Sequence, residues 1–153
     1  MSVVDVEIGK LTGSRRTQTG KGVARKLRRA GQIPAVLYGE GGENEMITLD
    51  PVAMLKAVDP AKRRNTVFTL TIDEGDGTTT EQKVMIKDYQ RDTLLDDWLH
   101  ADFIRVTDDT QVHVEIPFIL EGSAIGIQAG GKVSQVFHTL PFVCATNAIP
   151  TSI

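Results

Sequence analysis

Basic side chains gather at the start of this sequence of 153 residues. Residues 1–31 hold eight Lys or Arg and two Asp or Glu, a formal net charge of +6, whereas the remaining residues hold nine bases and eighteen acids, a net charge of −9. The eight bases are Lys10, Arg15, Arg16, Lys21, Arg25, Lys26, Arg28 and Arg29. Clustered ammonium and guanidinium groups are typical of a surface that binds a polyanion. The alternative, a charged face that contacts only water, stays open on charge alone.

Two glycine-containing stretches invite comparison with ligand-binding loops, and both comparisons fail. A phosphate-binding P-loop that includes Lys21 needs a glycine where Arg15 stands and a Ser or Thr where Gly22 stands. A calcium loop over residues 73–77 needs oxygen ligands at its third and fifth positions, which are glycines here. We therefore expect no nucleotide hydrolysis and a simple hairpin turn at 73–77.

His100 and Asp102 stand two residues apart, hence on one face of a strand, where each can orient the other. No third ligand follows at metal spacing, and the single cysteine, Cys144, has apolar or small neighbours that favour a buried thiol. One cysteine also excludes an internal disulfide and fits a reducing cytoplasm. These patterns predict a binding protein and no enzyme, with no metal, no other cofactor and no small-molecule substrate.

A strand, a loop and a helix are expected to position the basic residues. Alternating polarity predicts a strand over 3–11, and glycines among hydroxyl and amide side chains predict a loop over 13–22. Residues 23–30 predict a helix whose apolar stripe consists of Val23, Leu27 and Ala30. The three guanidinium groups expected together on the opposite face belong to Arg25, Arg28 and Arg29.

Short strands and one further helix follow as far as residue 106. We expect strands over 33–39, 46–49, 66–72, 81–89 and 98–106, the third and fourth forming a hairpin. Asp50 and Pro51 predict the start of a helix that ends near Val58. Its residues suited to packing on the sheet are Val52 and Leu55, with Met54 and Val58 as further candidates. Residues 107–110 predict a turn or linker, after which we expect a strand over 112–120 and two more within 132–146. The fold class is α+β and mainly β.

No apolar run approaches the roughly 20 residues that a membrane helix needs, and residues 1–10 lack the layout of an export signal. We therefore expect neither membrane association nor export.

Residues 108–153 are too few to bury much core alone.

Several blocks resemble one bacterial ribosomal family. The segment 21–39 (KGVARKLRRAGQIPAVLYG) closely resembles the signature of large-subunit ribosomal protein twenty-five, in its longer CTC or general stress protein form. Residues 87–91 (KDYQR) and 100–103 (HADF) resemble two further blocks of that family, and 121–131 and 147–150 are similar to its second domain.

The resemblance implies an N-terminal β-barrel with two or three short helices over 1–107, which binds 5S rRNA. It also implies the start of a second all-β domain over 108–153, which stops before that domain is complete. The expected partners are 5S rRNA and other large-subunit ribosomal proteins, in the cytoplasm on the ribosome and without homo-oligomers.

The resemblance also implies which residues contact RNA. Arg16, Lys21, Arg25, Arg28 and Arg29 would hold phosphate or ribose. Tyr38, Lys87, Gln90, His100 and Asp102 would contact base edges or ribose in a shallow RNA minor groove. Two alternatives stay open: a stress-induced RNA-binding protein acting off the ribosome, and a DNA-binding protein that places helix 23–30 in a major groove. The second is the weaker, because a lone short helix lacks the support of a helix-turn-helix.

Overall fold

The computed structural model describes residues 8–39, 41–94 and 97–153. The chain forms two compact units, Met1–Thr107 and Asp108–Ile153. Within the described residues no helix is long and apolar enough to cross a membrane.

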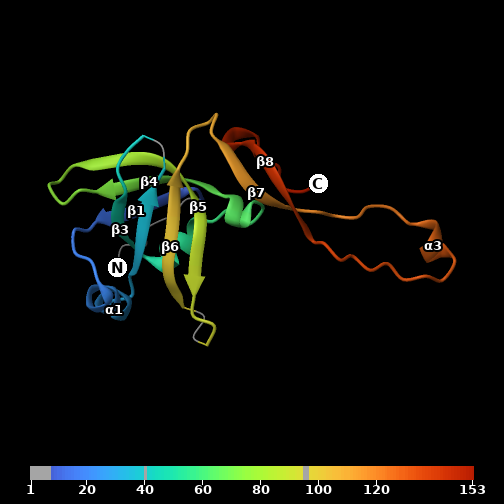
Figure 1. Cartoon of the computed structure of the whole chain (residues 1–153), viewed down its shortest axis with the longest axis horizontal. Helices are drawn as coiled ribbons and strands as arrows, with labels where there is room; N and C mark the ends of the chain where they lie inside the picture. Colours follow the sequence, from blue (N-terminus) through green and yellow to red (C-terminus); the bar gives the residue numbers. More distant parts are fainter. Residues whose placement is uncertain (1–7, 40, 95–96) are drawn as a thin grey trace. The chain divides into compact units, whose positions relative to one another are not determined.

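The first unit is built around a closed barrel of six strands (Figure 1). The strands are β1 (Lys10–Arg15), β2 (Ile33–Tyr38), β3 (Glu45–Leu49), β4 (Val67–Asp73), β5 (Thr79–Arg91) and β6 (Trp98–Arg105). Their order around the barrel is β1-β3-β2-β6-β5-β4, and parallel pairing of β1 with β4 closes it. The predicted mainly β fold with an N-terminal barrel is confirmed.

The barrel interior is filled by alternate side chains of the strands. Phe68 of β4 and Phe103 of β6 are fully buried and meet edge to face, with ring centroids 6.3 Å apart. Leu37 of β2 and Ile47 of β3 are likewise fully buried. Burial of this apolar surface is the main favourable contribution to folding, so these strands form a rigid support for whatever their outer faces carry.

β1 corrects the prediction at the N-terminus. Of the strand expected over 3–11, residues 3–7 lie outside the described residues, and the observed strand runs from Lys10 to Arg15. The loop expected from residue 13 was wrong over 13–15 because Gly13 is buried inside the barrel. A Cβ there would lie 2.7 Å from Cδ2 of Leu49, so the glycine serves close packing of β1 on β3 and marks no turn.

Two helices and a 3₁₀ turn accompany the barrel: α1 (Lys21–Arg29), α2 (Pro51–Ala57) and η1 (Arg63–Asn65). As predicted, Asp50 caps α2, its carboxylate accepting from the Val52 amide at 2.8 Å. The predicted packing face of α2 was wrong for Val52 and Leu55, which remain 55% and 51% exposed. It was right for Met54, which is fully buried together with Ala57, and for Val58, which packs partly buried against the core.

The second unit is an antiparallel pair of strands, β7 (Gln111–Pro117) and β8 (Thr139–Ala145). Val112, Val114 and Ile116 of β7 are buried. The connection between the strands contains α3 (Ile125–Gln128) and is almost entirely exposed; Figure 1 shows it as a long arm leaving the pair. Only one of the two strands expected within 132–146 forms, and Cys144 is half-buried instead of buried.

Candidate nucleic-acid interface

Helix α1 carries the densest group of bases in the chain. It begins at Lys21, after Gly20 at φ 108°, and its first turn has neither a capping side chain nor an acid. Four amide N–H groups at a helix N-terminus lack intrahelical acceptors and carry partial positive charge. With Lys21 added and no acid nearby in sequence, this end of α1 is suited to an external anion.

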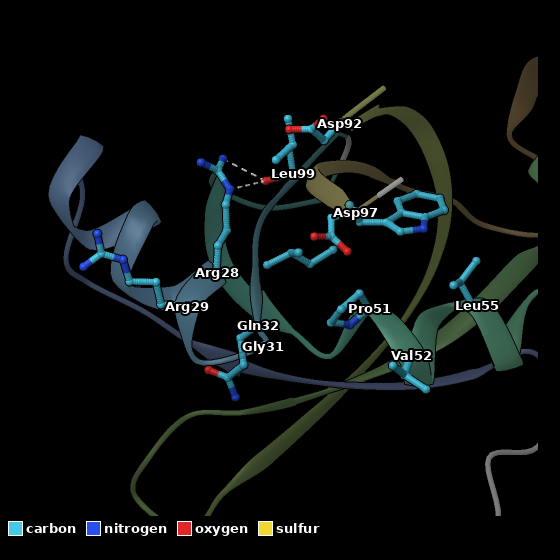
Figure 2. Close-up of a pocket in the computed structure, with 12 residues that line it drawn as sticks. Arg28, Arg29, Gly31, Gln32, Pro51, Val52, Leu55, Asp92, Asp97 and Leu99 are labelled. Carbon is cyan, nitrogen blue, oxygen red and sulfur yellow. Dashed lines mark hydrogen bonds between the residues drawn. The ribbon is translucent and has the colours of Figure 1, made fainter. Parts of the chain in front are cut away.

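The apolar side of α1 is shallow. Val23, Ala24 and Leu27 are half-buried and no residue of the helix is fully buried, whereas Ala30, which we expected in the stripe, is exposed. The helix therefore depends on additional contacts to stay in place. Arg28 supplies one, because its Nε and Nη2 donate to the carbonyl oxygen of Leu99 in β6 at 3.0 and 2.8 Å (Figure 2).

This contact changes the role expected for the helix arginines. Arg25, Arg28 and Arg29 are all exposed, but two nitrogens of Arg28 already bind β6. Figure 2 shows Arg29 directed away from Arg28 and Leu99. The three guanidinium groups therefore do not form one equivalent set: Arg25 and Arg29 project outward, whereas Arg28 fixes the helix.

Arg16 also has a structural contact. It follows β1, and its Nε donates to the carbonyl oxygen of Ile47 at 3.2 Å while Nη1 donates to that of Gln18 at 3.0 Å. Desolvation by partial burial lowers the pKa of this guanidinium from its ordinary value, yet a guanidinium stays charged near neutral pH. Arg16 thus holds the loop 16–20 that leads to Lys21, and its positive charge stays at the base of that loop.

The barrel contributes a second set of polar residues, on the outer face of β2, β6 and β5. Because Leu37, Ala101 and Phe103 point into the barrel, their strand neighbours point outward. Val36 of β2 pairs with Asp102 of β6. On the other side of β6, Asp102 pairs with Asp88 of β5 and His100 pairs with Gln90 of β5. The outer face therefore brings together the predicted residues Tyr38, Gln90, His100 and Asp102.

Two of these residues hold each other. Nδ1 of His100 lies 3.0 Å from Oδ1 of Asp102, as their spacing on one strand face predicted. Burial raises the pKa of the Tyr38 hydroxyl, and the negative charges of Asp102 and Asp88 raise it further. Tyr38 therefore keeps its proton and can donate to an acceptor on a ligand.

Lys87 sits at an irregularity of β5, where the register shifts between Ile86 and Asp88. It is exposed, and its carbonyl oxygen accepts from Nη2 of Arg64 at 2.6 Å. The extra residue re-aims the strand, so that Asp88 and Gln90 face outward beyond it. Sequence reasoning missed Asp88 and Arg64, although the run 62–64 (KRR) is a visible basic signal.

The contact between Arg28 and Leu99 joins the two sets. Leu99 immediately precedes His100, so the basic helix is attached at the outer polar face of β6. Cationic groups, whose chemistry suits a phosphate backbone, and hydrogen-bonding groups, whose chemistry suits base edges, thus occupy neighbouring surface. Within the described residues no group of three or more His, Cys, Asp or Glu could hold a metal ion.

A sequence profile described as the Ribosomal L25p family matches residues 11–103, which include every one of these predicted RNA-contacting residues. The chain belongs to the Ribosomal L25p family. The resemblance drawn from 21–39, 87–91 and 100–103 is thereby confirmed.

The relatives of this L25p chain are named large ribosomal subunit protein bL25. That of Sorangium cellulosum is 37% identical over 148 residues, covering 97% of this chain and 63% of the relative. That of Anaeromyxobacter dehalogenans is 38% identical over 143 residues, covering 94% of this chain and 58% of the relative. That of Novosphingobium aromaticivorans is 39% identical over 145 residues, covering 94% and 69%. The chain thus spans about three-fifths of the length of the first two relatives.

Proposed function

We propose that the chain is a structural component of the bacterial large ribosomal subunit, in the cytoplasm, and that its first unit, 1–107, binds the internal loop of 5S rRNA. α1 and the loop before it bind the phosphate backbone. The outer face of β2, β6 and β5 contacts ribose and base edges. Binding by this rigid barrel helps to organise the RNA and needs no catalytic group.

One observation carries the proposal: Arg28 fastens the basic helix to β6 beside His100. RNA minor grooves are wide and shallow and display 2′-hydroxyls and base edges between two phosphate strands. A surface that binds such a groove needs cations at its margin and neutral or mixed hydrogen-bonding groups at its centre. Here Lys21, Arg25 and Arg29 supply the cations, and Tyr38 and the His100–Asp102 pair supply the centre.

The family supports the ribosomal part of the proposal, because the relatives are named as large-subunit ribosomal proteins. The geometry supports RNA over duplex DNA. In a helix-turn-helix a partner helix supports the recognition helix in the major groove, whereas α1 is fastened at its C-terminal end to a barrel strand, β6. An acid at the centre of the surface, Asp102, can accept a hydrogen bond from a guanine amino group or a 2′-hydroxyl.

Binding experiments test the RNA part. The full chain is titrated against 5S rRNA, 5S rRNA with the internal loop replaced by paired bases, and duplex DNA of equal length. We expect binding to intact 5S rRNA at least about tenfold tighter than to the other two, the size of one to two good base contacts. In the same titrations Arg25→Ala should weaken binding to 5S rRNA, because it removes one cation of the proposed interface. Lys56→Ala in α2 is its charge-matched control, since Lys56 is exposed and lies outside that interface. Equal affinity for all three nucleic acids would contradict recognition of the internal loop.

Sedimentation tests the ribosomal part. Native lysate is separated on a sucrose gradient, and the chain is quantified against large-subunit proteins. We expect it in the large-subunit fractions at about one copy per subunit. Recovery mainly in ribosome-free fractions would contradict a structural role and favour the off-ribosome alternative.

A further inference from the structure

The connection between α2 and β4 carries a second group of bases. Lys62, Arg63 and Arg64 follow one another there, at the 3₁₀ turn η1, and we call residues 62–64 the basic turn. The segment 59–64 holds three bases and one acid, and the neighbouring Lys87 and Asp88 of β5 add one of each. This edge of the barrel therefore has a formal net charge of +2, which attracts an anion.

Arg64 fastens the basic turn to β5. Its Nη2 donates to the carbonyl oxygen of Lys87 at 2.6 Å and lies 3.8 Å from Oδ1 of Asp88, and its guanidinium lies over the Tyr89 ring at 5.8 Å. Asp88 in turn pairs across the strands with Asp102 of β6. The basic turn is thus held at the border of the outer polar face that the proposed function assigns to ribose and base edges.

The backbone at Arg63 is strained. Arg63 is the one non-glycine residue with a positive φ within the described ranges, at 49°. Its amide donates to the carbonyl oxygen of Asp59 at 2.7 Å, and its own carbonyl oxygen accepts from the amide and Oγ1 of the buried Thr66 at 3.2 and 2.6 Å. A glycine would adopt this conformation without strain. Because strained residues gather at ligand-binding sites, an arginine here points to a task for its exposed guanidinium outside the fold.

The basic turn and α1 lie on opposite sides of the outer polar face. α1 contacts β2 and is fastened to β6 by Arg28, whereas the basic turn contacts β5. The strand order is β2-β6-β5, so the two outer strands are two inter-strand spacings apart, about 10 Å. A hydrogen-bonding centre with cations on both sides has the layout that a wide, shallow groove between two phosphate strands requires.

We propose that the basic turn binds the phosphate backbone of the RNA strand opposite to the strand that α1 binds. Lys62 and Arg63 contact the phosphates, and Arg64 is a positioning residue that keeps the turn beside β5. This inference rests on the proposed function and deepens it, because it adds the second margin of the same RNA surface.

Directed hydroxyl-radical cleavage tests the placement. An Fe(II)–EDTA group is tethered to single cysteines in the full chain, in which Cys144→Ser removes the native thiol. Ala61→Cys labels the basic turn and leaves all its bases in place, Lys26→Cys labels α1, and Thr80→Cys labels the far end of β5 as the control; all three positions are exposed. We expect positions 61 and 26 to cleave opposite strands of the internal loop of bound 5S rRNA, and position 80 to cleave neither.

Salt-dependent titration tests the contact itself. Arg63→Gly removes the guanidinium and fits the positive φ without strain, so the melting temperature should not fall. The magnitude of the salt slope should fall by about 0.7–0.9, as for one lost phosphate contact. Arg63→Lys keeps the charge and should retain the slope, as should the control Lys56→Ala in α2.

Three results would each overturn the role of the basic turn. They are no RNA cleavage from position 61, as expected if the turn binds an acidic protein segment, cleavage of the same strand from positions 61 and 26, and an unchanged salt slope for Arg63→Gly. Cleavage of the loop from position 26 would in each case leave the proposed function intact. No cleavage from either position, together with no preference for intact 5S rRNA, would contradict the proposed function and the role of the basic turn with it.

Discussion

Nδ1 of His100 lies 3.0 Å from Oδ1 of Asp102 on the outer face of β6. A carboxylate oxygen accepts a hydrogen bond, so Nδ1 is the donor to Asp102 and Nε2 is the ring nitrogen left for a ligand. The pair therefore fixes the ring and its tautomer in advance.

Replacing this pair should reduce discrimination more than affinity in general. For His100→Ala we expect a loss of about 1–3 kcal/mol in binding to intact 5S rRNA, and a smaller loss with RNA whose internal loop is paired. Asp102→Asn keeps the size of the side chain and should weaken discrimination through the position of His100. Titrations of both RNAs at one salt concentration provide the measurement. Equal losses with both RNAs would show that the pair does not contact the loop.

The helix arginines should separate into two kinds. Arg25→Ala should lower the magnitude of the salt slope by about 0.7–0.9, as expected for one lost phosphate contact, without changing the melting temperature. Arg28→Ala should in addition destabilise the barrel by about 1 kcal/mol, because its two hydrogen bonds to Leu99 are lost. Salt-dependent titration and thermal unfolding of each variant check this. An unchanged melting temperature for Arg28→Ala would mean that the helix does not need the contact.

Tyr38→Phe removes one hydroxyl and no charge. Because burial and nearby carboxylates keep this hydroxyl protonated, it is a donor throughout the physiological pH range. We expect a loss of about 0.5–1.5 kcal/mol in binding to 5S rRNA with an unchanged salt slope. A changed slope would place Tyr38 at a phosphate, and an unchanged affinity would leave it as a packing residue of β2.

The strands were predictable because their alternation is set by the barrel wall. β4 and β5 appeared as a hairpin from β-forming residues on either side of a glycine turn, and the observed register joins Val67–Asp73 to Thr79–Met85. Gly13 was misassigned because a glycine followed by a serine and two arginines has the composition of a loop. Gly13 belongs to a strand because the Leu49 side chain packs into the space that a Cβ on residue 13 would need.

The candidate site was predictable in its residues and not in its connections. The run of bases in 21–29 is visible in the sequence, but no spacing rule relates Arg28 to Leu99, which lies 71 residues later. On α2 the two apolar stripes, Val52 with Leu55 and Met54 with Ala57, have equal periodicity. The choice between them depends on the barrel and not on local sequence.

Gly13→Ala should destabilise the barrel, since the added Cβ would meet Leu49 at 2.7 Å and the Thr48 carbonyl oxygen at 3.3 Å. We expect a cost of about 1–3 kcal/mol, measured by urea unfolding. Gly22→Ala is the matched control, because a Cβ there meets nothing within 4 Å. In the first turn of α1 it should stabilise by up to about 1 kcal/mol. Destabilisation of the same size in both variants would contradict the assigned role of Gly13.

The first unit should fold and bind RNA by itself. The connected buried core, from Leu11 to Phe103, lies within it, as do all ten residues expected from the sequence to contact RNA. A fragment of residues 1–107 should therefore unfold cooperatively and bind 5S rRNA within about twofold of the full chain, a difference of less than 0.5 kcal/mol.

Limited proteolysis of the full chain gives an independent check of the same boundary. The connection 118–138 is almost entirely exposed, so the first cuts should fall there and leave a resistant fragment that contains the barrel. An unfolded 1–107 fragment, or one that has lost RNA binding, would mean that the two units share stabilising contacts. In that case residues 108–153 would belong to the RNA-binding domain, and the boundary at Thr107 would not separate two independent folding units.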